Sequence, residues 1–263
     1  GEFLHSMTAS AMERDGLQET FPIEIPGGEH VVINAATAPI IYNKGGSILR
    51  QLKGYIGEEA FQSGLTNYLE EHAYDNAMSH HLWEAFEAAS HLPVVSMIQS
   101  WIEQPGYPIV EARRDGSRLI LSQKRFTYLA NPSDQIWQIP VSVTAFTPSG
   151  QENPHAILLD SRQDEIDLGA DAVAYKINTD QTGFFRVKYT DTDNLAALGR
   201  QVQSREISAL DRWGLENDLY ALMKGGDATA ESYLDFLSNY TTETDFLPLV
   251  SIAGNLYSAY LIA

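Results

Sequence analysis

Several residue types are missing or scarce in this chain of 263 residues, and each absence excludes a class of site. The sequence contains no cysteine, which excludes disulfides, thiolate zinc sites, iron–sulfur clusters and cysteine nucleophiles. Lys and Arg number 17 against 35 Asp and Glu, and the net charge of −18 repels phosphate backbones and anionic membranes. No apolar run approaches the ~20 residues of a membrane span, and no signal peptide opens the chain. We therefore predict no nucleic-acid or membrane partner and a soluble, cytoplasmic protein.

Complete catalytic motifs are also missing. None of the histidines is followed by Glu or has a second histidine three or four residues away, so no helical pair can face one metal ion. The sequence has no Gly-Lys dipeptide of a phosphate-binding loop, no Gly-x-Ser-x-Gly elbow and no Gly-x-Gly-x-x-Gly fingerprint. His80 and His81 point about 100° apart on a helix, which favours solvated surface residues over metal ligands. These residues predict no metal site in the chain itself.

The composition is that of a globular protein, since 44% of the residues are apolar and 20% are charged. The length of 263 residues suggests two or three compact units. The charge is uneven: residues 1–106 carry 4 basic and 14 acidic residues, 107–191 carry 9 and 11, and 192–263 carry 4 and 10. The hydrophobic period changes at the same places, which predicts boundaries near residues 106 and 191.

The first unit, residues 1–106, has the period of helices. Apolar residues recur about every 3.6 positions over 41–56, and further helices are predicted over 58–69, from an N-cap at Ser79, and from about Pro93 to Ile102. The run Gln104-Pro105-Gly106-Tyr107-Pro108 then breaks any helix twice.

Residues 107–191 alternate with a period of two instead. Strands at 109–113 and 119–123 flank an Asp-Gly turn, which predicts a hairpin. Further strands are predicted at 136–146, 156–159, 174–177 and 184–189. We expect a small antiparallel β-sandwich here. Helices return in 192–263, over 211–223 with Gly225-Gly226 as the stop, then over 230–237 and 247–261.

Both ends of the sequence look cut. The chain enters a helical pattern at Gly1 without an initiator methionine, and apolar residues 257–262 stop in mid-helix without a cap. We interpret the sequence as a piece of a longer protein; the alternative is that disordered tails have been trimmed.

One segment, Tyr42-Asn43-Lys44-Gly45-Gly46, combines a tyrosine at a helix start with two poor helix formers, each costing ~1 kcal/mol relative to Ala. The glycines suggest that something approaches the backbone closely. The Tyr42 phenol could then donate a hydrogen bond to a developing oxyanion. On these residues alone, the alternative is a tyrosine that anchors a buried helix.

Beyond this segment, an ordered set of motifs resembles the M1 family of zinc aminopeptidases, nearest to the archaeal tricorn-interacting type. The set comprises Tyr42-Asn43-Lys44-Gly45, Leu49-Arg50, Ile56-Gly57-Glu58-Glu59-Ala60-Phe61, Gly64-Leu65, Tyr68-Leu69, His72 to Ala77, Leu82-Trp83, Trp101, Gln104 to Pro108, Asp211 to Leu215 and Asp218-Leu219.

The resemblance implies a multidomain α+β fold. Residues 1–106 would be the helical C-terminal part of a thermolysin-like catalytic domain, 107–191 an antiparallel β-sandwich, and 192–263 the start of an α-helical C-terminal domain. It further implies that the zinc motif His-Glu-x-x-His and the substrate-amine motif, both missing here, lie in segments before Gly1. Zinc is therefore expected in the intact enzyme, with no ligand from this chain.

Tyr42 matches the family tyrosine that stabilises the tetrahedral intermediate after zinc-bound water attacks the scissile carbonyl. Lys44 and Gly45 match motif positions that we interpret as structural support. Three departures bear on this match: Asn43 replaces a usual acidic residue, Phe21-Pro22 replaces His-Pro, and residues 35–41 replace the usual Phe-Asp-x-Ile-Ser.

The function implied by the resemblance is release of N-terminal amino acids from peptides, by an intact enzyme of which this chain is an inactive part. An alternative from another class is a non-catalytic binding or scaffold module that uses the sandwich and the helical surfaces. A His-Glu-x-x-His upstream of Gly1 would decide for the enzyme.

We predict that the 263-residue chain, purified alone, binds no stoichiometric zinc and hydrolyses no amino-acid amide. The reason is that it offers only isolated imidazoles and carboxylates as ligands. Elemental analysis that finds about one tightly held zinc per chain would refute this prediction.

Overall fold

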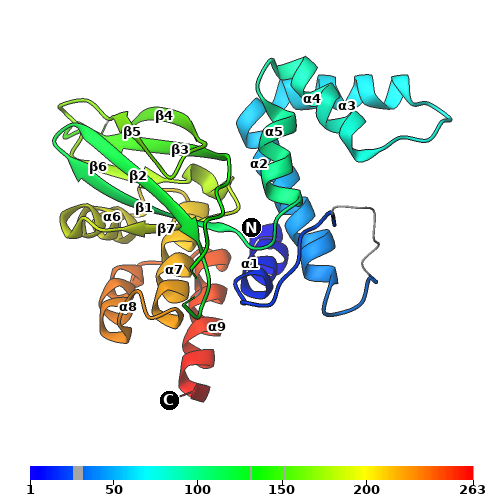
Figure 1. Ribbon diagram of the computed structural model, residues 1–263. Helices are drawn as coiled ribbons and strands as arrows, with labels where there is room; N and C mark the ends of the chain where they lie inside the picture. The colour runs from blue at the N-terminus through cyan, green and yellow to red at the C-terminus, as the bar shows by residue number, and fades with distance from the viewer. Residues whose placement is uncertain (26–31, 131, 151, 263) are drawn as a thin grey trace.

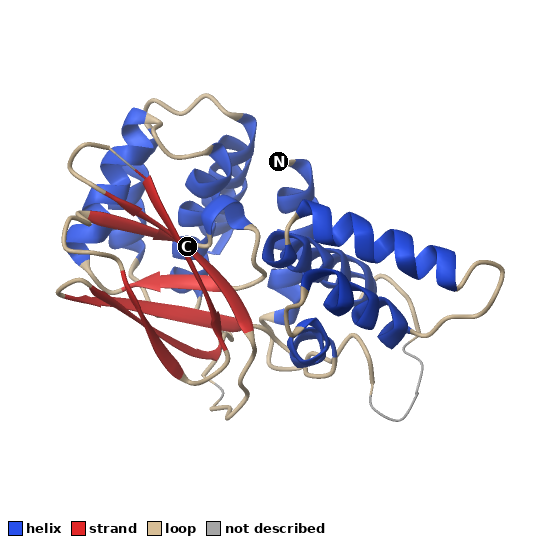
Figure 2. Ribbon diagram, turned by 90° about the horizontal axis from the view of Figure 1, so that it is seen from above, coloured by secondary structure: helices blue, strands red, loops and turns tan. Residues whose placement is uncertain are grey.

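The computed structural model describes residues 1–25, 32–130, 132–150 and 152–262. His30 lies outside the described residues. In the described part, two groups of helices flank a set of strands (Figures 1 and 2). None of the helices in these ranges is long and apolar enough to cross a membrane.

The N-terminal helical group follows the predicted period. It comprises the π-helical turns η1 (Leu4–Thr8) and η2 (Pro39–Lys44) and the helices α1 (Ala9–Asp15), α2 (Gly45–Ile56), α3 (Glu58–Glu71), α4 (Ser79–Ser90) and α5 (Val94–Ile102). The N-cap assigned to Ser79 is wrong by one residue. Met78 has the extended backbone of a cap, and its N–H donates to Nδ1 of His81 at 3.1 Å. The cap is thus formed by a side chain from within the helix, so Ser79 becomes the first helical residue.

The strands form a four-stranded and a three-stranded sheet. They are β1 (Pro108–Asp115), β2 (Arg118–Arg125), β3 (Ile139–Phe146), β4 (Glu152–Leu159), β5 (Gln163–Asp167), β6 (Ala174–Ile177) and β7 (Arg186–Tyr189). The sheet orders are β5-β2-β1-β7 and β4-β3-β6. The predicted hairpin is confirmed: Asp115 pairs with Arg118, and Gly116 takes the left-handed backbone (φ 63°) that the turn requires.

The expectation of a purely antiparallel sandwich is wrong at one strand. β7 pairs parallel with β1, with Ile109 opposite Arg186. A parallel pair needs a long crossover, and here the chain passes through the second sheet between β1 and β7. β5 was not predicted, because its sequence Gln-Asp-Glu-Ile-Asp lacks apolar alternation.

The two sheets share one hydrophobic core with the N-terminal helices. Its largest fully buried side chains include Trp101 from α5, Tyr107 and Trp137. Trp101 also donates from its indole nitrogen to the carbonyl of Gln138 at 2.9 Å, which ties α5 to the second sheet. The α3–α4 pair extends away from the sheets (Figure 1), but Phe86 of α4 belongs to the same core.

The C-terminal helices pack against the edge strands β6 and β7 of the two sheets, and Trp213 and Leu247 from this group also contact Leu4 of η1. They are α6 (Thr192–Ser204), α7 (Ala209–Lys224), α8 (Ala230–Leu237) and α9 (Phe246–Ile262), with the 3₁₀ turn η4 (Ser238–Tyr240). Another 3₁₀ turn, η3 (Thr179–Gln181), lies between β6 and β7. Ser208 caps α7 by accepting a hydrogen bond from the Asp211 N–H at 3.1 Å. The domain boundaries at 106/107 and 191/192 stay predictions.

The turn η3 joins all three groups. Asn178, Asp180 and Gln181 have positive φ angles of 60°, 56° and 52°, a conformation that non-glycine residues rarely adopt. Arg50 of α2 donates to the carbonyls of Asp180, at 2.8 Å, and of Gln181. Asp211 of α7 accepts from the Asp180 N–H at 2.9 Å. Contacts from two other elements therefore hold the strained turn.

We predict that Gly64→Ala in α3 destabilises the protein by about 1 kcal/mol or more, although Ala favours helices. An added Cβ would lie 2.6 Å from Cδ1 of Phe86 and 3.1 Å from the Ala85 carbonyl, so α3 and α4 must separate. Gly254→Ala in α9 is the matched control, because its Cβ would meet nothing within 4 Å. Urea denaturation should show the control up to ~1 kcal/mol more stable than the parent. Equal changes in the free energy of unfolding of both variants would contradict the close packing of α3 against α4 at Gly64.

Candidate active site

Tyr42 lies in η2, which begins at Pro39 and ends at Lys44. Asn34 orders the turn before it by accepting a hydrogen bond from the Ala36 N–H at 2.8 Å. The Tyr42 side chain is 56% exposed, so it does not anchor a buried helix in this structure. Its helical turn is of the π type, which occurs frequently at functional sites.

Lys44 points the opposite way and is fully buried. Residues two apart on a helix face nearly opposite sides, so an inward Lys44 leaves Tyr42 outward. The Lys44 Nζ lies 2.9 Å from Oδ2 of Asp15, and neither side chain is exposed. The same Nζ donates to the carbonyl of Gly106 at 2.9 Å.

Asp15, the last residue of α1, completes this buried network. Its Oδ1 accepts from the Gly106 N–H at 3.1 Å and from the Thr20 hydroxyl at 2.6 Å. Both backbone groups of Gly106 are therefore bound by charged side chains. We call Asp15, Lys44 and Gly106 the buried clamp, because they join α1, η2 and the link into β1.

Tyr107 strengthens the same junction. Its hydroxyl donates to the Met12 carbonyl of α1 at 3.0 Å. Complete burial raises the pKa of Tyr107 well above its ordinary value, so the hydroxyl stays protonated and remains a donor. The Pro-Gly-Tyr-Pro run, predicted as a helix breaker and as one of the family-like motifs, therefore also holds the helices against the sheet.

The interpretation of the glycines requires a correction. A Cβ at Gly45 would meet nothing within 4 Å, and one at Gly46 would touch the Phe3 ring at 3.5 Å, an ordinary contact. Within the described residues, nothing approaches the Gly45 backbone closely. Tyr42, Gly45 and Leu49, three to four residues apart, instead lie along one side of the η2–α2 helix, where Tyr42 and Leu49 are exposed and Gly45 is half-buried.

Asn43, one of the departures from the family pattern, faces α1. Its side-chain amide donates to the Ser10 hydroxyl at 3.3 Å, and its carbonyl accepts from the Ser47 hydroxyl at 2.8 Å. The Ser47 hydroxyl also lies 2.9 Å from that of Thr8 in η1. The departure thus belongs to the packing between η2 and the first helices, and not to the surface that carries Tyr42.

The described residues do not supply a zinc site. No group of three or more His, Asp or Glu side chains in these ranges is arranged to hold a metal ion. His72, His80 and His81 do gather at the α3–α4 end, with the rings of His72 and His81 stacked at 4.6 Å. The Nδ1 of His81, however, accepts from the Met78 N–H.

Sequence reasoning singled out Tyr42, Lys44 and Gly45 but missed Asp15. The structure brings Asp15 and Lys44 together and leaves Tyr42 and Gly45 on the outer side. No local signal marks Asp15 as a partner, because the two residues are far apart in sequence and meet only in the fold.

Comparison with known proteins agrees with this architecture. Residues 1–101 match the model of the peptidase family M1 domain, and residues 174–263 match that of the ERAP1-like C-terminal domain. These matches confirm the resemblance of the chain to the M1 family of peptidases.

Relatives of the chain include one named as a tricorn protease-interacting factor and two named as aminopeptidases. The chain is 34% identical over 261 residues to the tricorn protease-interacting factor F2 of Thermoplasma volcanium. This alignment covers 99% of the chain and 32% of the relative. It is 34% identical to aminopeptidase M1 of Arabidopsis thaliana, over 99% of the chain and 31% of the relative. It is 31% identical to a leucyl aminopeptidase of Saccharolobus solfataricus, over 99% of the chain and 32% of the relative. The chain thus spans about a third of the length of the relatives that it matches.

We predict that Lys44→Met lowers the free energy of unfolding by about 3–5 kcal/mol, because it leaves the Asp15 carboxylate buried without its cation. Lys53→Met is the control: the Lys53–Glu58 pair is shorter, at 2.6 Å, but its side chains are 45% and 76% exposed. It should cost less than about 1 kcal/mol. Equal losses in urea denaturation would show that the clamp does not stabilise the fold.

Proposed function

We propose that this chain forms part of a zinc aminopeptidase that releases N-terminal amino acids from peptides, and that it contributes Tyr42 to the active site. The observation that carries the proposal is the placement of Tyr42. Its phenol lies exposed on a helix that the buried clamp fixes from the opposite side. The similarity to M1 peptidases supports the class of reaction.

The phenol suits the chemistry of peptide hydrolysis. When water adds to the scissile carbonyl, the carbonyl oxygen gains negative charge that is absent in the bound substrate. A neutral O–H aimed at this oxygen stabilises the transition state more than the substrate and so raises kcat. Lys44 would act only indirectly, by holding η2 in place.

Zinc would supply Lewis-acid polarisation and an activated water in such an enzyme. We propose that its ligands come from outside this chain, since the described residues offer no suitable set. By the same reasoning the chain alone would be inactive. Its acidic composition suits a substrate with a cationic α-amino group.

The proposal also assigns domains. Residues 1–106 would be the helical end of the catalytic domain, 107–191 a β-sandwich domain, and 192–263 the start of the helical C-terminal domain. The match at 1–101 supports the first assignment at a coarser level, and the match at 174–263 covers the last unit together with β6 and β7. We place the enzyme in the cytoplasm.

The test is Tyr42→Phe in an enzyme that contains this chain together with its zinc-binding segment. The change removes only the hydroxyl, so we expect kcat to fall roughly 10²–10³-fold, with KM little altered. Tyr74→Phe is the matched control, since Tyr74 is fully exposed in the α3–α4 loop. It should leave both constants unchanged.

Steady-state kinetics on an amino-acid amide and a thermal melt are measured for both variants. If Tyr42 serves only structure, the melting temperature falls while kcat stays within a few-fold of the parent. That result would overturn the catalytic role of Tyr42.

A further inference from the structure

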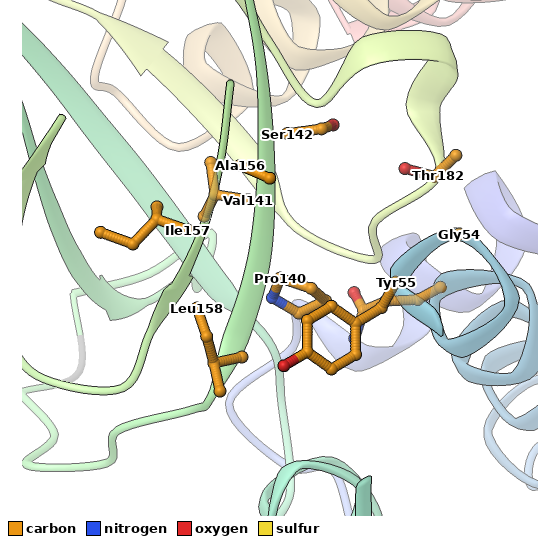
Figure 3. A pocket seen from close by; sticks show the side chains of 10 residues that line it. Gly54, Tyr55, Pro140, Val141, Ser142, Ala156, Ile157, Leu158 and Thr182 are labelled. Atoms are coloured by element: carbon orange, nitrogen blue, oxygen red, sulfur yellow. The ribbon is translucent and has the colours of Figure 1, made fainter. Parts of the chain in front are cut away.

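The N-terminal helices carry two features that the proposed function does not use. The first is a cleft of about 180 Å³ between α2 and the three-stranded sheet, with Tyr55 of α2 across from Pro140 and Leu158 (Figure 3). Among the described residues that line it none is charged, so the cleft does not select a ligand of particular chemistry. The second is a group of three histidines at the joint between α3 and α4, whose protonation has a defined structural consequence.

His81 closes the first turn of α4 from within the helix. Its Nδ1 accepts a hydrogen bond from the Met78 N–H at 3.1 Å, and its own N–H donates to the Met78 carbonyl at 3.2 Å. His81 is the third helical residue after the cap, the position from which Glu or Gln reaches back in a capping box. An imidazole can accept this bond only while it is neutral, because both ring nitrogens of the cation are donors.

Two further imidazoles contact the His81 ring. The His72 ring is stacked on it, with the centroids 4.6 Å apart and the planes 16° from parallel. The His80 ring centroid lies 4.1 Å from that of His81. A positive charge on His81 would be repelled by a charge on either neighbour, and it would lie at a helix N-terminus, where cations are unfavourable. Protonation of His81 therefore removes the cap and adds repulsion at the same place.

Two carboxylates lie at this joint as well, each with a donor of its own. Asp75 accepts from the Asn76 N–H at 2.7 Å, and Glu24 accepts from the Ser79 hydroxyl at 3.4 Å. Their negative charge favours a cation at the joint, whereas the cap requires a neutral His81. The titratable groups around His81 on α3, on α4, in the loop between them and in the segment before residue 26 are Tyr68, His72, His80, Glu84, Asp75 and Glu24.

The loop that the cap holds is strained. Tyr74 has a φ angle of 64°, a left-handed conformation that is rare for a bulky residue. The Asp75 N–H donates to the His72 carbonyl at 3.1 Å, which closes the turn around Tyr74. While the cap is intact, contacts on both sides fix the loop. Once the cap is lost, relief of the strain favours opening.

We propose that the joint between α3 and α4 is an acid-sensitive switch, in which uptake of a proton by His81 opens the first turn of α4 and releases the loop over 72–78. Imidazoles change charge between about pH 5 and 8, so the switch acts in this range. Tyr42, Lys44 and Asp15 lie on other elements, and the proposal therefore does not depend on the proposed peptidase function.

The test is a pH titration of the ¹³C,¹⁵N-labelled chain from pH 8 to pH 5.5, followed by NMR. We expect the Met78 amide signal and the helical ¹³Cα shifts of residues 79–82 to change together in one transition. The ratio of closed to open first turn should fall about fivefold, which corresponds to the ~1 kcal/mol typical of a helix N-cap.

Three variants locate the switch. His81→Gln keeps a side-chain acceptor that does not titrate, so the first turn of α4 should stay helical over the whole range. His81→Ala removes the acceptor, and the turn should already be open at pH 8. His5→Gln is the matched control, since it removes an exposed histidine of η1, and it should show the transition of the parent.

Two results would overturn the proposal. The first is a parent chain in which residues 79–82 keep their helical ¹³Cα shifts down to pH 5.5. The second is a transition in His81→Gln that matches the parent, since the opening would then not depend on His81. The first result uses the unaltered chain, so it does not depend on the folding of a variant.

Discussion

The ion pair between Lys44 and Asp15 is the contact on which the rest of the candidate site depends. Both charges are fully buried and pair directly with each other. Lys44 also donates to the Gly106 carbonyl, and Asp15 also accepts from the Gly106 N–H and the Thr20 hydroxyl. Buried charges tolerate few alternative arrangements, because each unpaired charge costs several kcal/mol. The pair therefore fixes the position of the C-terminal end of η2 relative to α1 and to the start of β1. Since Tyr42 lies two residues before Lys44, the same contact determines which way the phenol faces.

A second junction sets the position of α2 relative to the other elements. The left-handed residues of η3 are bound by Arg50 from α2 and by Asp211 from α7, and Gln51 binds the Phe184 N–H nearby. These contacts satisfy backbone groups that a strained turn would otherwise leave unpaired. The continuous helix η2–α2, which carries Tyr42, is thus fixed in position from several sides.

The sequence predicted those parts of the fold that depend on neighbouring residues. The helices predicted over 58–69 and 230–237, observed as α3 and α8, and the hairpin at Gly116 follow from period, capping and turn chemistry. Pairings between distant segments could not be predicted in the same way. The parallel partner of β1 begins only at Arg186, and β5 is held by its neighbour β2 and not by an apolar pattern of its own. Likewise, Tyr42 could be selected from its motif, whereas a buried Lys44 runs against the usual exposure of lysine. Its partner Asp15 becomes visible only in three dimensions.

The central claim is that Tyr42 donates a hydrogen bond to the oxygen that becomes charged during hydrolysis. The most direct measurement is a crystal structure of an aminopeptidase that contains this chain, bound to a phosphinic peptide that mimics the tetrahedral intermediate. The account predicts a distance of about 2.5–3.0 Å between the Tyr42 hydroxyl oxygen and a phosphinate oxygen. A Tyr42 hydroxyl that points away from the inhibitor, with another donor on that oxygen, would contradict it.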